Sequence, residues 1–323
     1  MPVPRRVVLA SGIAGLSAIT LPTPAVAGDM GPPIEHYAQL RRALIQTDNL
    51  IGPRHVLPTL QQHLARLTVR RRAARGTDAV KFLALETRYE ELAGWLAQDM
   101  GDERAARGHT ARALDASHVT GDMDLTAYIL GRKAQLAVDT GHPADALGLA
   151  AAARRAARPG SRLEVIAVMH QAHAHAVLGE ESSALGGYEM ALALFAAAGG
   201  DDVWGSWLDV SYLHTSRARS YAALGRYEQA AGGFESALAV LPVAYRRDRG
   251  VYLARAARAH AGAGDHARAA AIGLQAVGIA AETGSARTIG PLGKLDQALA
   301  AVPRVPGVAE FRGALDRIVL HPA

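Results

Sequence analysis

The feature that most constrains the fold is a glycine motif that occurs five times along the chain at nearly even intervals. The five positions are Gly101, Gly141, Gly179, Gly225 and Gly264, which lie 40, 38, 46 and 39 residues apart. Each glycine is followed by an alanine five residues later and by a second alanine twelve residues later. Glycine adopts the left-handed conformation that ends a helix. The pattern predicts antiparallel helix pairs that stack, because no single pair can bury its apolar face.

The composition agrees with closely packed helices and excludes several chemistries. Half of the 323 residues are hydrophobic but only 5% are aromatic, and alanine supplies much of the apolar count. Alanine is the best helix former, and no segment shows the two-residue alternation of a strand. The chain contains no cysteine, which excludes thiol catalysis, disulfides and cysteine metal sites. The net charge of +5 favours acidic partners only mildly.

The stretch at 217–242, "RARSYAALGRYEQAAGGFESALAVLP", resembles the 34-residue tetratricopeptide unit. That unit has a glycine turn, then a small residue, an aromatic residue and another small residue in its second helix, and a closing proline. Here Ala230, Phe234 and Ala237 follow the turn, and Pro242 closes the unit. The intervals between the recurring glycines exceed 34 residues, so we expect longer helices or linkers than in the minimal repeat.

We therefore predict an all-α, tetratricopeptide-like, right-handed helical solenoid of about five helix pairs, with extra capping helices at both ends. The predicted organisation is a signal-like or linker segment at 1–28, N-terminal capping helices at 29–78, the repeat solenoid at 79–285 and C-terminal capping helices at 286–323. Thr77 or Asp78 is expected to start the first long helix. We expect a loop with a capped helix start at 196–210 and a charged loop, "YRRDRG", at 245–250.

The first helix of each pair should line the concave surface, and the tetratricopeptide register indicates which positions point inward. These positions carry the charged, amide and aromatic side chains that suit an extended peptide or a partner helix. They are Arg88, Glu91, Trp95, Gln98, Asp99, Tyr128, Gln135, Asp139, Ile166, Met169, His173, Tyr212, Thr215, Arg219 and Arg258. The alternative is a surface that is only solvated, or one that is covered by the chain's own termini.

The histidines of "MHQAHAHA" at 169–176 raise the question of a metal site, because His170 and His173 lie three residues apart on one helix face. No HExxH motif is present and no acidic third ligand is fixed nearby. We predict no metal, and we interpret both as core or groove histidines. His173 could make ligand binding sensitive to pH.

Catalytic motifs are not found in the sequence. It has no GxSxG, no glycine-rich phosphate loop and no defensible setting for paired carboxylates. We therefore predict that the protein is not an enzyme and needs no cofactor.

Two further stretches could make contacts. The run at 65–81 carries Arg66, Arg70, Arg71, Arg72, Arg75 and Lys81 and could touch phosphates, but the solvated face of a helix explains it better. Trp204 and Trp207 either pack the long linker onto the solenoid, which we favour, or present a contact patch.

The segments at 88–117, 121–141 and 172–195 resemble the C-terminal tetratricopeptide region of actinobacterial Xre-type helix-turn-helix transcriptional regulators. The first segment reads "RYEELAGWLAQDMGDERAARGHTARALDAS", and the resemblance covers roughly residues 36–320. It implies a regulatory protein that binds a peptide or protein in its concave groove, in transcriptional or developmental control. The architecture is also similar to peptide-responsive Gram-positive regulators whose solenoid binds a signalling peptide.

The chain departs from these families in two ways. The helix-turn-helix domain is absent, so direct nucleic-acid binding is not expected and a separate DNA-binding protein would be the partner. The peptide-responsive relatives hold the peptide backbone with groove asparagines, whereas this chain has one asparagine, Asn49, outside the repeats. Gln98 and Gln135 could substitute. A homodimer through the terminal helices is compatible with the sequence but is not required by it.

The first 27 residues contain the three parts of a secretory signal. A twin arginine, Arg5 and Arg6, precedes an uncharged run from Val7 to Leu21, and Ala25-Val26-Ala27 follows. In the regulators that the chain resembles, such a stretch can follow the DNA-binding domain as a cytoplasmic linker. Met1 would then be an internal start, or the chain would be a regulator that has lost its DNA-binding domain. We expect a cytoplasmic protein. The alternative is an exported tetratricopeptide scaffold for protein–protein assembly, carried by a twin-arginine-like signal at 1–27.

Overall fold

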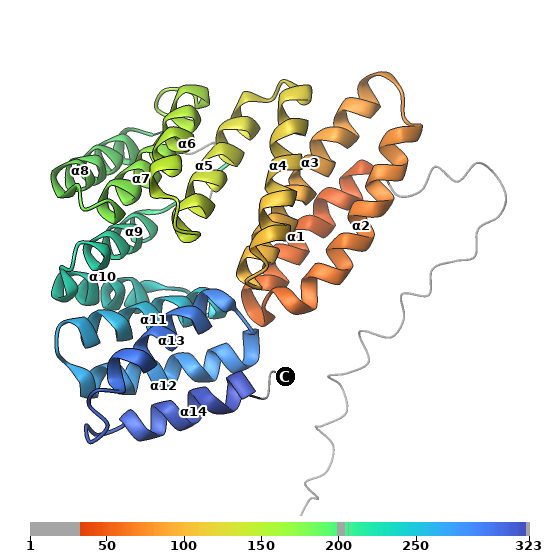
Figure 1. Ribbon diagram of the computed structural model, residues 1–323. Coiled ribbons are helices and arrows are strands. Elements are labelled where there is room, and N and C mark those ends of the chain that lie inside the picture. The colour runs from red at the N-terminus through yellow and green to blue at the C-terminus, as the bar shows by residue number, and fades with distance from the viewer. Residues whose placement is uncertain (1–32, 199–203, 206, 321–323) are drawn as a thin grey trace, which may run out of the picture.

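The structure, a computed structural model, describes residues 33–198, 204–205 and 207–320. Over these residues it contains α-helices and no strand, wound into one curved stack (Figure 1). The predicted all-α, tetratricopeptide-like solenoid is confirmed. The predicted segment at 1–28 lies outside the described residues. The helices are α1 (Ile34–Ile51), α2 (Pro53–Ala73), α3 (Gly76–Asp99), α4 (Glu103–Thr120), α5 (Met123–Asp139), α6 (Pro143–Ala156), α7 (Arg162–Val177), α8 (Glu181–Ala197), α9 (Val210–Ala223), α10 (Tyr227–Val240), α11 (Arg246–Gly262), α12 (His266–Thr283), α13 (Ala286–Leu299) and α14 (Val308–Leu320).

The five recurring glycines end helices as predicted, each with a φ angle between 75° and 87°. At the first of them, the amide of Asp102 donates to the carbonyl of Ala97 at 2.9 Å, which closes the end of α3. The Asp102 carboxylate then accepts from the Ala105 amide at 2.9 Å and caps the start of α4. The glycine and the aspartate together reverse the chain within a few residues.

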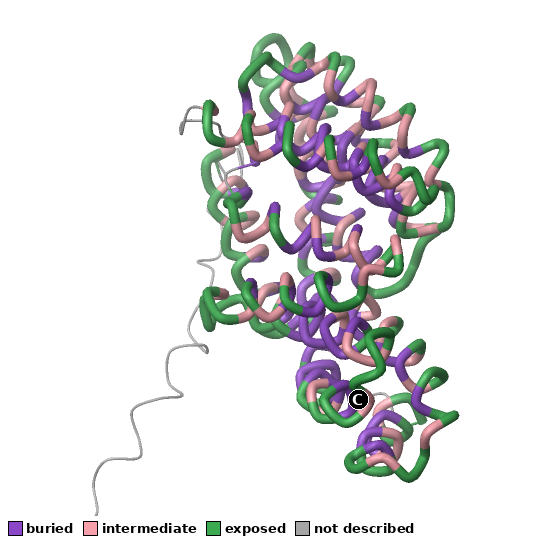
Figure 2. The backbone as a smooth tube through the Cα atoms, turned by 90° about the vertical axis from the view of Figure 1, so that its left-hand side faces the viewer, coloured by how far each residue is buried: buried purple, intermediate pink, exposed green. Residues whose placement is uncertain are grey.

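The alanines that follow each glycine lie at the crossings between helices. All ten are at most 2% exposed, so each allows two backbones to approach with no bulky side chain between them. The repeat aromatics fill the remaining space: Phe234 and Tyr188 are each 1% exposed. Figure 2 shows buried residues gathered along the middle of the stack and exposed residues along its outer edges.

The two ends of the solenoid meet, so that the stack closes on itself (Figure 1). We call this contact the seam: α1 and α3 on one side, and α11, α12 and α13 on the other. The turn at Gly52 lies directly against the turn after α12, because a Cβ on Gly52 would overlap the Thr283 carbonyl. Gly284 lies against the Arg54 guanidinium in the same way. The terminal helices therefore cover part of the concave surface, which is one of the alternatives that the sequence left open.

The ends of several helices differ from the sequence-based expectations. α3 begins at Gly76, one residue before Thr77. α9 begins at Val210, and its N-cap residue Asp209 accepts from the Tyr212 amide at 2.7 Å, so the capped helix start is confirmed. The predicted loop at 245–250 is wrong, because α11 begins at Arg246. Among the described residues, none of the helices is long and apolar enough to cross a membrane.

The error at 245–250 has a physical cause in the seam. A run of arginines with an aspartate indicates a solvated loop only if no residue from a distant part of the chain forms an ion pair with it. Here Arg247 is 4% exposed and ion-paired with Asp48, which lies 199 residues earlier in the chain. The first turn of α11 is therefore held by a contact that no local pattern could show.

Candidate functional site

The inner surface of the stack is built by the first helix of each pair. α5, α7, α9, α11 and α13 contact one another in succession, and α3 meets α13 across the seam. Because these helices converge, side chains from distant repeats come within hydrogen-bond distance. We call this region the inner surface.

The structure places the predicted groove residues in three environments. One set is buried, and it consists of Glu91, Gln98, Asp99, Gln135, Ile166, Met169, His173 and Thr215. A second set is partly exposed, and it consists of Arg88, Trp95, Tyr128, Tyr212 and Arg219, together with Asp139, whose side chain is 23% exposed. Arg258 is exposed. Ile166 and Met169 lie in a hydrophobic cluster with Tyr188 and Leu213, so they contribute to packing between helices.

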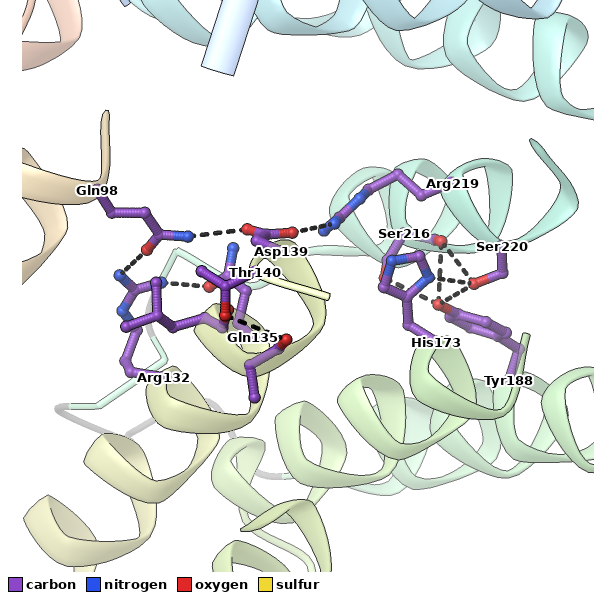
Figure 3. Close-up of polar contacts among 12 residues, drawn as sticks. Gln98, Arg132, Gln135, Asp139, Thr140, His173, Tyr188, Ser216, Arg219 and Ser220 are labelled. Atoms are coloured by element: carbon purple, nitrogen blue, oxygen red, sulfur yellow. Dashed lines mark hydrogen bonds and ion pairs between the residues drawn. The ribbon is translucent and has the colours of Figure 1, made fainter. Parts of the chain in front are cut away.

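A continuous chain of polar contacts crosses the inner surface (Figure 3). Arg132 donates to the Gln98 carbonyl oxygen at 2.9 Å, and the Gln98 amide donates to Asp139 Oδ2 at 2.8 Å. Arg219 donates to the other Asp139 oxygen at 2.9 Å. Arg132 also donates to Gln135. Residues from α3, α5 and α9 are thus joined in one network.

The network continues toward the N-terminal helices through Glu91. This carboxylate pairs with Arg41 of α1 at 3.1 Å and lies 3.6 Å from Arg132. Burial alone would raise the pKa of Asp139, but the surrounding arginines, Arg219 first, hold that pKa below its usual value. Asp139 therefore remains ionised at neutral pH, and both carboxylates are matched by guanidinium groups.

Trp95 lies at the centre of this surface among three arginines. The guanidinium carbons of Arg132 and Arg287 are each 4.5 Å from the centre of the indole ring, and that of Arg247 is 5.1 Å away. Such cation–π contacts are worth about 0.5–1 kcal/mol each at exposed sites and about 2 kcal/mol when desolvated. Arg132, Arg247 and Arg287 were missed by the sequence analysis. The sequence does contain an indication for Arg132: it lies one helical turn after Tyr128, a predicted inward-pointing position, and therefore on the same helix face.

Asp99 belongs to the seam and does not line an open groove. Its Oδ1 accepts from the Ser285 hydroxyl at 2.6 Å, and its Oδ2 lies 3.8 Å from Arg247 Nε. Burial raises the pKa of Asp99, while Arg287 and the Ser285 hydrogen bond oppose that rise. Arg247 also donates to Asn49 at 3.0 Å. These contacts tie α3 and α1 to α11 and the turn before α13.

The two histidines are buried and neutral. His173 Nδ1 lies 2.8 Å from the Ser220 hydroxyl, which also contacts the Tyr188 hydroxyl at 2.9 Å (Figure 3). Burial and then the neighbouring Arg219 lower the pKa of His170 to about 3, and lower the pKa of His173 well below its usual value. The described residues contain no group of three or more histidine or acidic side chains placed to hold a metal ion.

The tryptophans before α9 pack onto the inner surface. Trp204 stacks on Tyr128 with ring centres 4.7 Å apart, and the Arg88 guanidinium lies 4.9 Å from the Trp204 ring. Trp207 contacts Tyr212 edge-on at 4.7 Å and remains 39% exposed. The segment that they belong to therefore covers Arg88 and Tyr128, two of the predicted groove residues.

The basic run at 65–81 spans the end of α2 and the start of α3. Arg71 pairs with Glu86, and the Arg70 guanidinium lies 5.1 Å from the Phe82 ring centre. Arg75 donates to three carbonyl oxygens at the end of α2. Several of these cations are thus engaged in holding α2 against α3.

Comparison with known proteins finds similarity only among solved structures. No protein-family model matches the chain, and no curated protein matches it. The crystal structure of BtubC (BKLC) from P. vanneervenii is similar over 71% of this chain and 91% of that chain, with 19% identity and a TM-score of 0.46. The crystal structure of a Podosopora anserina putative kinesin light chain with nearly identical TPR-like repeats is similar over 60% of this chain and 96% of that chain, with 17% identity and a TM-score of 0.41.

Proposed function

We propose that this protein is a non-catalytic interaction protein that binds a peptide or protein segment on its inner surface. The observation that carries the proposal is the number of buried polar atoms without a hydrogen-bond partner on that surface. They include Arg88 Nε, Gln135 Nε2 and Arg287 Nε and Nη1. Buried polar atoms in native proteins are nearly always paired, so a bound segment with donors and acceptors would complete this set.

The side chains available there suit a polypeptide ligand. Aromatic rings and arginines are enriched in the energetically important parts of protein interfaces. Trp95, Tyr212 and Arg219 all lie on the inner surface and all keep some exposure. Tyr212 and Arg219 belong to α9, so one helix would present both an aromatic and a charged contact.

A site-specific crosslinking experiment tests the proposal. A photoreactive amino acid replaces Tyr212 on the inner surface, or Val119 of α4, which is 75% exposed. In the cells that make the protein, we expect a crosslinked polypeptide from position 212 and none from position 119. The crosslink should disappear in Arg219→Ala. Equal crosslinks at both positions, or none at 212, would contradict binding on the inner surface.

We further propose that binding serves transcriptional or developmental control. The support is the resemblance of 88–117, 121–141 and 172–195 to the regulatory region of Xre-type proteins. A separate DNA-binding protein would then be the partner, and the protein would act in the cytoplasm, alone or as a homodimer. Chromatin immunoprecipitation with and without that partner tests this role. Operator occupancy that does not depend on the solenoid would refute it.

The alternative of an exported scaffold is favoured by one observation, the twin arginine and apolar run at 1–27. The mass of the native protein in separated cytoplasmic and external fractions decides between the two. A chain without residues 1–27 in the external fraction would establish export and would exclude transcriptional control. An intact chain in the cytoplasm would exclude export.

A further inference from the structure

We propose that the seam is a pH-dependent switch, which takes up one proton from the solvent at Asp99 when it closes and is therefore held more firmly as the pH falls. The seam joins the C-terminal ends of α1 and α3, which carry Asp48 and Asp99, to the N-terminal ends of α11 and α13. The proposal concerns the closure of the solenoid and does not depend on what binds the inner surface.

Closure gathers three carboxylates around one guanidinium. Arg247 contacts Asp48, lies 3.2 Å from Asp248 Oδ1 and lies 3.8 Å from Asp99 Oδ2. Arg247 and Asp248 both belong to α11, so they stay together when the seam opens. Asp48 and Asp99 come from the other side of the seam and return to water. Closure thus brings two negative charges to a guanidinium that already has an acid beside it.

Asp99 is the carboxylate that this arrangement compensates least directly. It is 0% exposed, and its Oδ1 accepts from the neutral Ser285 hydroxyl at 2.6 Å. Its Oδ2 is buried and has no hydrogen-bond partner among the described residues. A buried carboxylate is costly unless it is both paired and hydrogen-bonded. A proton on Oδ2 removes the charge and leaves the Ser285 hydrogen bond to Oδ1 in place.

The charged groups around Asp99 do not offset its burial. Burial raises the pKa of Asp99, Arg287 and the Ser285 hydrogen bond lower it, and Asp248 raises it, with a net rise. Arg287 also attracts Asp248 and Asp139, so its charge is shared. The charged groups on the helices that meet at the seam are Asp48 of α1, Arg54 of α2, Arg247 and Asp248 of α11, Arg287 of α13, and Glu282 of α12, which pairs with Arg246.

The direction of the pH effect follows from the two states of Asp99. In the open form the carboxyl group lies in water, where the usual pKa of an aspartate is about 3.9. In the closed form its pKa is raised. Between these two pKa values only the closed form holds the proton, so the ratio of closed to open molecules should rise up to tenfold for each unit by which the pH falls. Above the raised pKa neither form holds it, and the seam is weakest.

Single-molecule energy transfer on the full chain tests the switch. The sequence contains no cysteine, so two introduced cysteines can be labelled specifically. Gln46→Cys on α1 and Lys294→Cys on α13 place one dye on each side of the seam, and both positions are exposed. The ratio of closed to open molecules is counted between pH 5 and 8, at the highest urea concentration that leaves the far-UV circular dichroism unchanged at every pH. We expect more closed molecules at lower pH.

Three substitutions in this labelled chain separate protonation from a structural role. Asp99→Asn imitates the protonated carboxyl group, so the ratio should lose its pH dependence and should be at least as high as that of wild type at pH 7.5. Asp248→Asn removes a neighbouring negative charge, so the midpoint of the pH profile should move to lower pH. Asp78→Asn is the matched control, because Asp78 lies on the same helix as Asp99 with a side chain that is 69% exposed; it should leave the profile unchanged.

Several results would overturn the switch. They are a ratio in the wild-type chain that does not change with pH, a seam that opens as the pH falls, and a seam that stays closed at every pH. An open seam in Asp99→Asn at pH 7.5 would show that the charge of Asp99 is needed for closure. If that variant does not fold, the profile of Asp248→Asn decides, since an unshifted midpoint would refute the switch. None of these results bears on peptide binding, which the crosslinking experiment tests.

Discussion

Removal of Arg247 should open the seam. Its guanidinium is buried and contacts Asp48 of α1, Asn49 of α1 and Asp248 of α11, and it lies 3.8 Å from Asp99 of α3. Asp48 and Asp99 are 1% and 0% exposed. In Arg247→Ala both carboxylates would stay in the closed seam without this positive charge.

The expected cost follows from the burial of the pair. Loss of one partner of a buried ion pair costs about 3–5 kcal/mol, because the remaining charge is left uncompensated. In a stacked repeat protein, such a loss is local and need not unfold the other repeats. The closed seam can avoid the cost by separating, which returns the carboxylates to water. The ratio of open to closed molecules should therefore rise by a factor of about 100 to 3,000.

Hydrogen exchange measured by mass spectrometry checks this expectation. Amides of α1 and α13 should lose protection in Arg247→Ala, while those of α5 to α8 should keep theirs. Small-angle scattering should show a larger radius of gyration. The matched control is Arg246→Ala, since Arg246 pairs with Glu282 where the two side chains are 44% and 54% exposed. Such exposed pairs contribute about 0.2–1 kcal/mol. Equal protection of α1 in wild type and Arg247→Ala would refute the reasoning.

Three further perturbations test other parts of the structure. Because the pKa values of His170 and His173 are lowered in the folded protein, these two side chains bind protons below pH 6.5 only in the unfolded chain. The free energy of unfolding should therefore fall between pH 6.5 and about 3. Each histidine should contribute a fall of about 1.4 kcal/mol per pH unit. Urea unfolding at pH 7.5 and 5.0 measures this fall, and a His170→Asn variant with an unchanged pH dependence would contradict it. Gly52→Ala should loosen the seam, because the new Cβ would overlap the Thr283 carbonyl. The control is Gly264→Ala, since Gly264 has a similar φ angle and no atom lies within 4 Å of its new Cβ; it should cost only backbone strain of about 1 kcal/mol. Equal hydrogen exchange of α1 in both variants would disprove the steric argument. Phe234→Ala should cost about 3–5 kcal/mol in urea unfolding, because Phe234 is 1% exposed, and a loss below about 1 kcal/mol would show that the repeat core repacks.

The repeats could be predicted from the sequence because their determinants are local. A turn glycine such as Gly225 and the alanines at Ala230 and Ala237 lie within thirteen residues of one another. The glycine is required by a positive φ angle, and the alanines are required by a close helix crossing. The pattern occurs five times, which strengthens the prediction. The same register brought Glu91 and Asp139 to the inside of the stack, where both join the inner network.

The closure of the solenoid could not be predicted in this way. It depends on Arg247 meeting Asp48 and on Ser285 meeting Asp99, which are pairs 199 and 186 residues apart. No periodicity links such positions, and the charge of "YRRDRG" indicates a solvated loop when it is considered alone. Without closure, the concave positions predict an open groove. With closure, Asp99 and Gln135 become buried members of a polar interior.

The polar interior explains why closure and ligand binding should be linked. Apolar surface drives the stacking of repeats, but the inner surface buries charge, so the seam gains little hydrophobic stabilisation from it. Ion pairs such as Arg247–Asp48 favour closure, and the Arg287 guanidinium and the Asp99 carboxylate attract each other across the seam. A peptide segment that binds the inner surface of the closed form alone would stabilise that form by mass action. Linkage is reciprocal, so a change that opens the seam lowers the apparent affinity for such a segment in proportion to the closed fraction that is lost. Arg247→Ala should therefore lower the affinity for a peptide ligand of the inner surface to the extent that it opens the seam.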